Sequence, residues 1–142
     1  MSITAGSVIA SANAKKATGT AAATITAGQT LYADPNDGMW LNLADNNGNS
    51  AAIKCVGIAL MGAARGNPVD YVYEDPDLAI GATVTVGAIY GLSDTPGGIM
   101  KYIAAGDLST LLVAAMYPNV LFIGKTATTV NMKILSSTVA AV

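Results

Sequence analysis

The chain contains 142 residues, which is enough for a single domain with a buried core. Only 11% of the residues are charged, against roughly 25% in an ordinary soluble domain, and the net charge is −2. The seven Lys and Arg residues form no basic stripe and no apolar run approaches 18 residues, so neither nucleic-acid binding nor a membrane span is expected. Because a surface with few charges promotes association, we expect the chain to work in an assembly.

Residues 1–23 consist mainly of Ala, Ser, Thr and Gly, with no helical stripe and few apolar side chains to bury. The segment lacks the basic and apolar regions of a secretory signal. Two interpretations stay open: a flexible tail, or an extended arm that orders only against a neighbouring chain. We therefore divide the chain into an N-terminal arm, 1–23, and a single β-rich domain, 24–142.

A first β-hairpin is expected where two apolar runs, 30–34 and 39–43, flank a cluster of turn residues. Pro35 presets φ for a turn, and Gly38 accepts a positive φ at little cost. An Asp that opens such a turn accepts a hydrogen bond from the backbone two residues further on. Asp34 and Gly38 are therefore interpreted as structural turn residues.

The same plan recurs in a second hairpin, with the same four-residue spacing between Asp94 and Gly98. A strand at 83–86 leads into the hairpin strands 88–92 and 99–103. A Thr-x-Gly triplet precedes each of the two hairpins. This duplication predicts two similar β halves packed around one core.

Short strands with turn signals every 8 to 12 residues fill the rest of the domain. The acidic sequence 74–77 (EDPD) is expected to break the strand before it. The sequence thus predicts an all-β fold, a small β-barrel or sandwich built from short antiparallel strands and hairpins. The remaining strands are expected at 24–26, 53–60, 69–73, 110–115, 120–123 and 130–134.

The residue types that carry most enzyme chemistry are scarce. The chain has no His, so the commonest general base and metal ligand are missing. The single Cys, Cys55, stands in an apolar run and is interpreted as a core residue. The loop that begins at Asp45 lacks the Gly and Glu of a calcium loop, and turn geometry explains Asp34 and Asp94. We expect no catalytic residues, no cofactor and no metal.

Three other features have both a structural and a functional interpretation. The sequence 74–77 could bind a cation or a basic partner, or it could blunt an edge strand. Arg65 could make a bidentate contact with a partner, or it could be a solvated turn residue. Aromatic side chains in the expected strands could pack in the core, stack a sugar or form an interface hot spot. These are Trp40, Tyr71, Tyr73, Tyr90 and Tyr102.

Five motifs follow one another along the chain: 25–32 (ITAGQTLY), 37–40 (DGMW), 56–66 (VGIALMGAARG), 80–90 (IGATVTVGAIY) and 92–99 (LSDTPGGI). In this order they resemble the small capsid decoration (cement) proteins of tailed bacteriophages. The likeness covers about residues 24–116, and an Ala/Thr-rich N-terminal arm is also typical of that family. The Val-Gly-Ile strand after an Asp-rich hairpin is distantly similar to the lambda-type head decoration protein.

The resemblance implies a structural virion protein, not an enzyme, that docks on the outside of an icosahedral phage head. Such proteins commonly bind as homotrimers at local threefold positions, contact the major capsid protein and brace neighbouring capsomers. The chain would be made in the host cytoplasm and end on the outer capsid surface. Contacts are expected on the uncharged faces and at Ser2, Ile3, Thr4, Val8, Ile9, Lys15, Lys16 and Arg65.

Two hypotheses from other classes stay open. A carbohydrate-binding or fibre-like β-sandwich module would use Trp40 and the tyrosines to stack sugar rings. A hydrolase would have to rely on carboxylates alone, since the chain has no His.

Overall fold

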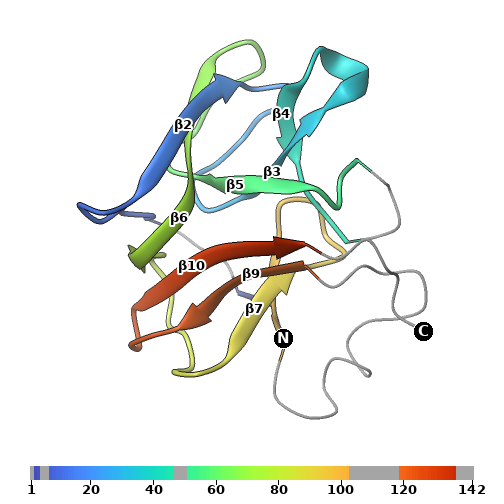
Figure 1. Ribbon diagram of the computed structural model, residues 1–142. Helices are drawn as coiled ribbons and strands as arrows, with labels where there is room; N and C mark the ends of the chain where they lie inside the picture. Colours follow the sequence, from blue (N-terminus) through green and yellow to red (C-terminus); the bar gives the residue numbers. More distant parts are fainter. Residues whose placement is uncertain (1, 4–6, 47–50, 103–118, 137–142) are drawn as a thin grey trace.

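The computed structural model describes residues 2–3, 7–46, 51–102 and 119–136, and these form an all-β fold (Figure 1). The strands pair antiparallel in one sheet of order β1-β8-β7-β9-β10-β6-β5-β3-β4, and β2 pairs with β6. The expected fold class is confirmed. The elements are β1 (Ser2–Ile3), β2 (Lys15–Thr20), β3 (Thr30–Asp34), the 3-10 turn η1 (Pro35–Asp37), β4 (Trp40–Leu43), β5 (Cys55–Ala59), β6 (Pro68–Ala79), β7 (Ile89–Leu92), β8 (Ile99–Tyr102), β9 (Asn119–Gly124) and β10 (Thr129–Ser136).

One half of the sheet curls into a small barrel, in the upper part of Figure 1. Its strands follow the order β2-β6-β5-β3-β4. Ala21, directly after β2, bridges Leu41 in β4, and Ala22 N donates to Leu41 O at 2.7 Å. This contact joins the two ends of the curled sheet. The barrel encloses a core of small and branched side chains, namely Ala21, Ile25, Leu31, Leu41, Ala59 and Val69.

The other half is formed by β7 to β10 and β1, and a second and larger core contains side chains from both halves. Tyr90 and Phe122 are buried there on neighbouring strands and stack with ring centroids 5.1 Å apart. The hydroxyl of Tyr90 accepts a hydrogen bond from Thr85 N at 2.9 Å. The halves are joined by the β6–β10 ladder and by a contact between the hairpins, where Gly97 N donates to Ala44 O at 2.8 Å.

The topology confirms that the two halves are similar, but the expected single core is not found, since the buried apolar side chains of the described residues form two clusters. One half has the order β4-β3-β5-β6 and the other β8-β7-β9-β10, so consecutive strands take the same places. Each half also has a register shift between the first hairpin strand and the strand after the hairpin. The Gly of each Thr-x-Gly triplet has a positive φ, 89° at Gly28 and 80° at Gly87. Their amides donate to Ala59 O and Gly124 O, both at 2.8 Å.

The first hairpin turn has the expected geometry. Asp34 accepts a hydrogen bond from Asn36 N at 2.9 Å, and Gly38 has a φ of 63°. Met39 also has a φ of 63° and is the one residue other than Gly with a positive φ in the described ranges. The turn therefore holds Met39 in a conformation that L side chains rarely adopt.

The second hairpin turn uses different residues from those expected. Ser93 Oγ accepts a hydrogen bond from Thr95 N at 3.1 Å, and the positive φ, 77°, is at Gly97. The four-residue spacing therefore belongs to Ser93 and Gly97, because a Ser hydroxyl caps a turn as an Asp carboxylate does. Asp94 is exposed in this turn. Gly98 is needed for another reason, since a Cβ there would collide with Ser93 Oγ.

The acidic sequence 74–77 does not break a strand, contrary to expectation. β6 runs without interruption through Pro76, beside a register shift in its ladder with β10. Asp75 is fully buried, and its carboxylate accepts hydrogen bonds from Ser11 N at 2.7 Å and Asp77 N at 2.9 Å. The Ser11 hydroxyl is a third donor. These donors compensate the buried carboxylate, so a sequence typical of a loop becomes strand.

Two of the expected strands are absent. Residues 83–86 form a loop before β7, because the chain turns at Gly87. Residues 24–26 contribute only an isolated bridge between Ile25 and Ala63. The strand expected at 110–115 lies outside the described residues. The strands expected at 53–60, 69–73, 120–123 and 130–134 are confirmed by β5, β6, β9 and β10.

The N-terminal segment is part of the domain and not an arm outside it. β2 pairs along β6, and Val8 belongs to the larger core. Ile9 and Ala79 exchange two backbone hydrogen bonds of 2.8 and 3.1 Å. The described residues 7–23 therefore find their partners in their own chain. For these residues, both the flexible tail and the arm that orders only against a neighbour were wrong predictions.

Candidate interaction surfaces

The described residues offer little for metal or membrane binding. No three Cys, Asp or Glu side chains in this part of the chain gather closely enough to hold a metal ion. No helix within the described ranges is long and apolar enough to cross a membrane. Large apolar side chains are exposed instead, and they are the first candidates for a functional surface.

Cys55 is a core side chain in β5. Burial raises the pKa of its thiol to about 12, so almost no thiolate is present at neutral pH. We expect a chromogenic disulfide reagent to label Cys55 roughly a hundredfold more slowly in the native protein than in denaturant. The measurement is the absorbance of released thiol against time. Equal rates in the two conditions would place the thiol at the surface.

The expected contact residues near the N-terminus differ in their surroundings. Ser2 and Ile3 form β1, which pairs with β8, and Thr4 lies outside the described residues. Val8 is buried, whereas the side chain of Ile9 is 65% exposed. Between these two, Ile9 is the side chain that can meet a partner.

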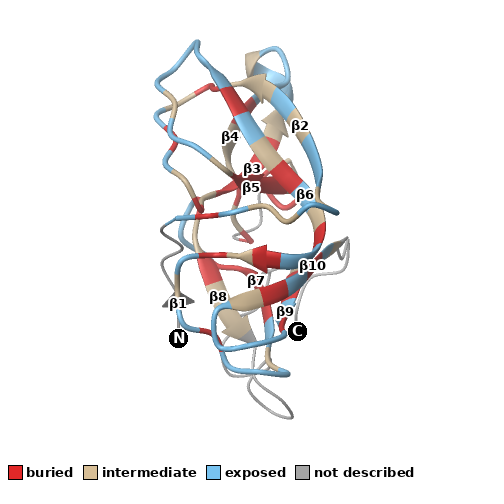
Figure 2. Cartoon of the chain, turned by 90° about the vertical axis from the view of Figure 1, so that its left-hand side faces the viewer, coloured by how far each residue is buried: buried red, intermediate tan, exposed pale blue. Residues whose placement is uncertain are grey.

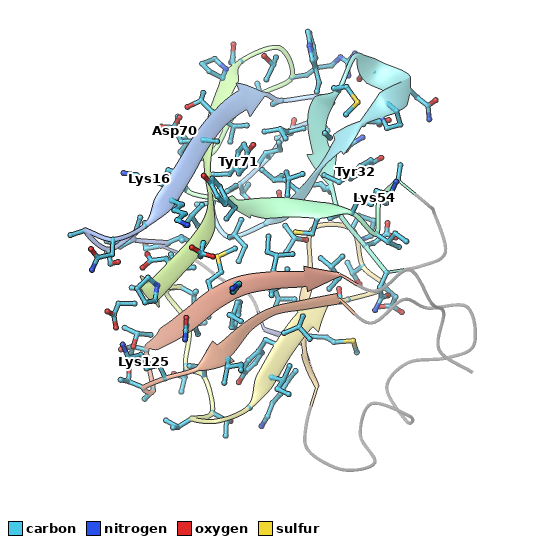
Figure 3. All side chains as sticks on the ribbon, viewed as in Figure 1. Lys16, Tyr32, Lys54, Asp70, Tyr71 and Lys125 are labelled. Carbon is cyan, nitrogen blue, oxygen red and sulfur yellow. The ribbon has the colours of Figure 1, made fainter. Side chains whose placement is uncertain are left out.

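Lys15 and Lys16 begin β2, and they have different roles. Lys15 Nζ lies 2.8 Å from Glu74 Oε2, and hydrogen bonding to Glu74 raises the pKa of Lys15. Lys16 is exposed beside Asp70, which accepts a hydrogen bond from Thr18 Oγ1 at 2.6 Å (Figure 3). Lys15 thus forms an ion pair between β2 and β6, whereas the side chain of Lys16 is exposed to solvent.

Asp75 is the buried anchor of the N-terminal segment. Burial opposes its ionisation, but hydrogen bonds from Ser11 and Asp77 keep the pKa of Asp75 below the ordinary value of 3.8. A carboxyl with a depressed folded pKa stabilises the protein above its unfolded pKa. That contribution is lost as the pH falls through the folded pKa.

We expect Asp75→Asn to lower the free energy of unfolding by about 2 kcal/mol at pH 7, because one buried donor loses its charged acceptor. The difference from the wild type should shrink at a second, acidic pH that is low enough to protonate the wild-type carboxyl, whose folded pKa lies below 3.8. Urea unfolding at the two pH values measures both effects. Asp94→Asn is the matched control, since Asp94 is exposed. A loss of equal size at both pH values would contradict the role of the charge.

The tip of the first hairpin carries what we call the hairpin-tip surface: Asp37, Met39, Trp40 and Arg65. Arg65 Nη1 and Nη2 lie 2.6 and 3.1 Å from the two carboxylate oxygens of Asp37. Arg65 also donates to the carbonyl of Ala22, and its guanidinium lies 5.5 Å from the Trp40 ring centroid. The bidentate partner of Arg65 is thus Asp37 of the same chain, and the hydrogen bonds from Arg65 lower the pKa of the Asp37 carboxyl.

Apolar exposure at the hairpin-tip surface is high. Met39 is 61% exposed and Trp40 is 36% exposed. Met, Trp and Arg are enriched at protein interfaces, and strained backbone such as that of Met39 clusters at functional sites. Because Asp37 already fixes Arg65, a partner would meet an ordered side chain and lose less entropy on binding.

A second apolar surface lies on the other half of the protein. We call it the β7–β9 surface, and it consists of Ile89 and Ile123, which are 40% and 45% exposed. The two residues are direct cross-strand partners, so their side chains lie on the same face of the sheet. Val86, which is 63% exposed, lies in the loop before β7.

The aromatic side chains do not form one platform. Tyr90 is in the core, and the side chain of Tyr102 lies outside the described residues. Tyr71 and Tyr73 are separated by one residue on β6, and only Tyr73 is strongly exposed. Trp40 is at the hairpin tip, with Arg65 over its ring. Any sugar stacking would therefore depend on isolated rings.

The chain matches no protein-family model, no curated protein and no solved structure. Its function is therefore inferred from the two exposed apolar surfaces. The β7–β9 surface was not foreseen, because Ile89 and Ile123 are 34 residues apart (123 − 89) and only strand pairing brings them together. The alternation of side chains along a strand gave a partial indication of this exposure. Ile89 and Ile123 are each next to a buried aromatic residue in the same strand, so their side chains face the other side of the sheet.

Proposed function

We propose that the chain is a structural virion protein that binds the outside of an icosahedral phage head and cements neighbouring capsomers. The observation that carries this proposal is the placement of two apolar surfaces at opposite ends of the protein. The η1–β4 turn is at one end and the loop before β7 at the other (Figures 1 and 2). A protein that braces two neighbours needs two contact areas that face apart.

The composition supports the same function. With few charges to desolvate, a broad surface can be buried against a shell at low cost. Weak individual contacts suffice, because several subunits on one lattice bind with combined strength. Association of the chain as a homotrimer, with the major capsid protein as its partner, is part of this proposal.

The direct experiment uses heads purified from the phage that encodes the chain, with and without its gene. Heads that lack the chain should break at a lower temperature, and adding the purified protein should restore their heat resistance. In complete particles the copy number should approach that of the major shell protein. A few copies per particle would indicate a fibre or a role at one vertex, and unchanged heat resistance would exclude cementing.

Variants of the hairpin-tip surface test the contact itself. Met39→Ser combined with Trp40→Ala should weaken binding to heads at least tenfold, a loss of about 1.4 kcal/mol. Met61→Ser is the matched control, since Met61 is 43% exposed elsewhere. Sedimentation with heads over a range of protein concentrations measures both.

Trp40 also supports a second candidate function, that of a carbohydrate-binding surface module. Its exposed indole could stack on a sugar ring. Binding of the chain to a glycan array, lost in Trp40→Ala and accompanied by no binding to heads, would favour this candidate over the first.

A further inference from the structure

The turn of the first hairpin holds one exposed apolar side chain in a strained backbone conformation. Met39 has a φ of 63°, and Gly38 before it has the same value. A positive φ strains a residue such as Met, whereas Gly, Asn and Asp adopt it readily. The turn alone would therefore be more stable with Asn in place of Met39.

Packing within the chain does not explain why Met stands at this position. The side chain of Met39 is 61% exposed and belongs to neither of the two buried clusters. Backbone strain of this kind is typical of binding sites, where the strained residue contacts another molecule. We therefore looked for the chemistry of the molecule that Met39 would contact.

The charged side chains near Met39 have partners in their own chain. Arg65 and Asp37 form a bidentate ion pair with distances of 2.6 and 3.1 Å. Asp34 is half-buried, and its carboxylate accepts three hydrogen bonds from other residues of the hairpin. Because these charges are already compensated, a partner of the hairpin-tip surface does not have to supply an opposite charge. The groups left for a partner are the apolar side chains of Met39 and Trp40.

We propose that Met39 inserts into an uncharged, apolar crevice of the head shell protein, with Trp40 packed at the edge of that crevice. This inference rests on the proposed function and names the central residue and the chemistry of the partner at one contact. The flexible thioether side chain of Met39 adapts to the shape of such a crevice. Arg65, which is held by Asp37 and by the carbonyl of Ala22, lies over the Trp40 ring and orders it before binding. Burial of Met39 against the shell offsets the strain that it imposes on the free protein.

A second copy of the chain also offers a place for an apolar side chain, but its position fits less well. An uncharged hollow of about 410 Å³ lies between Ile9, Ala79 and Thr128. This hollow is beside the β9–β10 turn, and the η1–β4 turn is on the opposite side of the molecule (Figure 1). Two complementary surfaces that face apart join copies into an open filament and not into a closed trimer. Contact between copies is therefore an outcome that the test has to exclude.

The test measures thermal stability and head binding for the same variants. Met39→Asn relieves the backbone strain and should raise the Tm of the free protein by about 2–4 °C. The same variant should bind about tenfold or more weakly to heads that lack the chain, because it removes the central apolar side chain of the contact. Scanning calorimetry gives the Tm, and sedimentation with heads gives the affinity. Because the crevice is uncharged, the ratio of wild-type to variant affinity should be equal at about 50 mM and 500 mM salt.

Two control variants separate strain from contact. Met61→Asn changes a Met that is 43% exposed and has no positive φ, so it should alter neither the Tm nor the affinity for heads. Met39→Leu keeps both an apolar side chain and the strained backbone. It should therefore bind heads within about threefold of the wild type and give no rise in Tm.

The outcomes separate this inference from the proposed function. If the wild type does not bind heads, the proposed function fails. If the wild type binds and Met39→Asn binds equally well, or if Met39→Asn does not raise the Tm, then Met39 is not a strained contact residue. An affinity ratio that approaches one at high salt would show that the crevice is charged. Self-association in analytical ultracentrifugation that Met39→Asn abolishes would assign the hairpin-tip surface to a second copy and overturn the inference.

Discussion

A chain that lacks residues 1–20 should have no cooperative thermal unfolding transition. The deletion removes β2 from the edge of β6, Val8 from the larger core and Ser11 from the carboxylate of Asp75. Loss of the two Ser11 hydrogen bonds to this buried carboxylate costs about 1.5–3 kcal/mol each. A small domain has only about 5–15 kcal/mol of stability in total. Thermal melting followed by far-UV circular dichroism measures the loss.

Deletion of residues 1–6 is the matched control. Among the described elements it removes only β1, and it leaves Val8, Ser11 and β2 in place. This shorter deletion should keep a cooperative transition. A chain without residues 1–20 that melts like the full-length protein would contradict the integration of the N-terminal segment. Tests of the segment in binding should therefore use point variants such as Ile9→Gln, which leave the sheet intact.

Gly124→Ala should lower the free energy of unfolding by about 3 kcal/mol. Gly124 ends β9, where its N–H donates to Ala88 O at 2.9 Å and its carbonyl accepts from Gly87 N at 2.8 Å. A Cβ at this position would collide with the carbonyl oxygen of Thr85 and lie 3.0 Å from the carbonyl carbon of Thr85. Both are backbone atoms, so no side-chain rotation relieves the contact.

Gly62→Ala is the control for the Gly124 variant. A Cβ on Gly62 would have Ile25 O as its nearest neighbour, at 3.4 Å, which is at the edge of ordinary contact. We expect the free energy of unfolding of the Gly62→Ala variant to stay within about 0.5 kcal/mol of the wild-type value. Urea unfolding of the three proteins gives the comparison. If both variants lose the same stability, the close approach between β9 and the loop before β7 is not what makes Gly124 necessary.

Local turn chemistry made the hairpins predictable from sequence. Asp34 and Gly38 fix a turn through contacts within a few residues, so the sequence nearby contains all that determines it. The second turn shows the limit of this reasoning. Both Ser93 and Asp94 could cap it, and both Gly97 and Gly98 could supply the positive φ, and the strand register decides between them.

Long-range contacts account for what the sequence did not reveal. The sequence 74–77 is typical of a loop until Ser11, far away in the chain, supplies donors to Asp75. The N-terminal segment has too few apolar residues to fold alone, and β6 supplies the edge that orders it. Exposure depends on such pairings as well, so the candidate contacts at Ile89 and Ile123 emerge only from the assembled sheet.

The pairing of β2 with β6 also has a consequence for biosynthesis. Thr18 and Asp70, which bond across this ladder, are 52 residues apart. At about 5–20 residues per second, β2 leaves the ribosome roughly 3–10 s before its partner is made. During that delay β2 is an unpaired strand, and such strands recruit other chains. Lys15 and Lys16 place two positive charges at its start, which discourages premature pairing between nascent chains until β6 arrives.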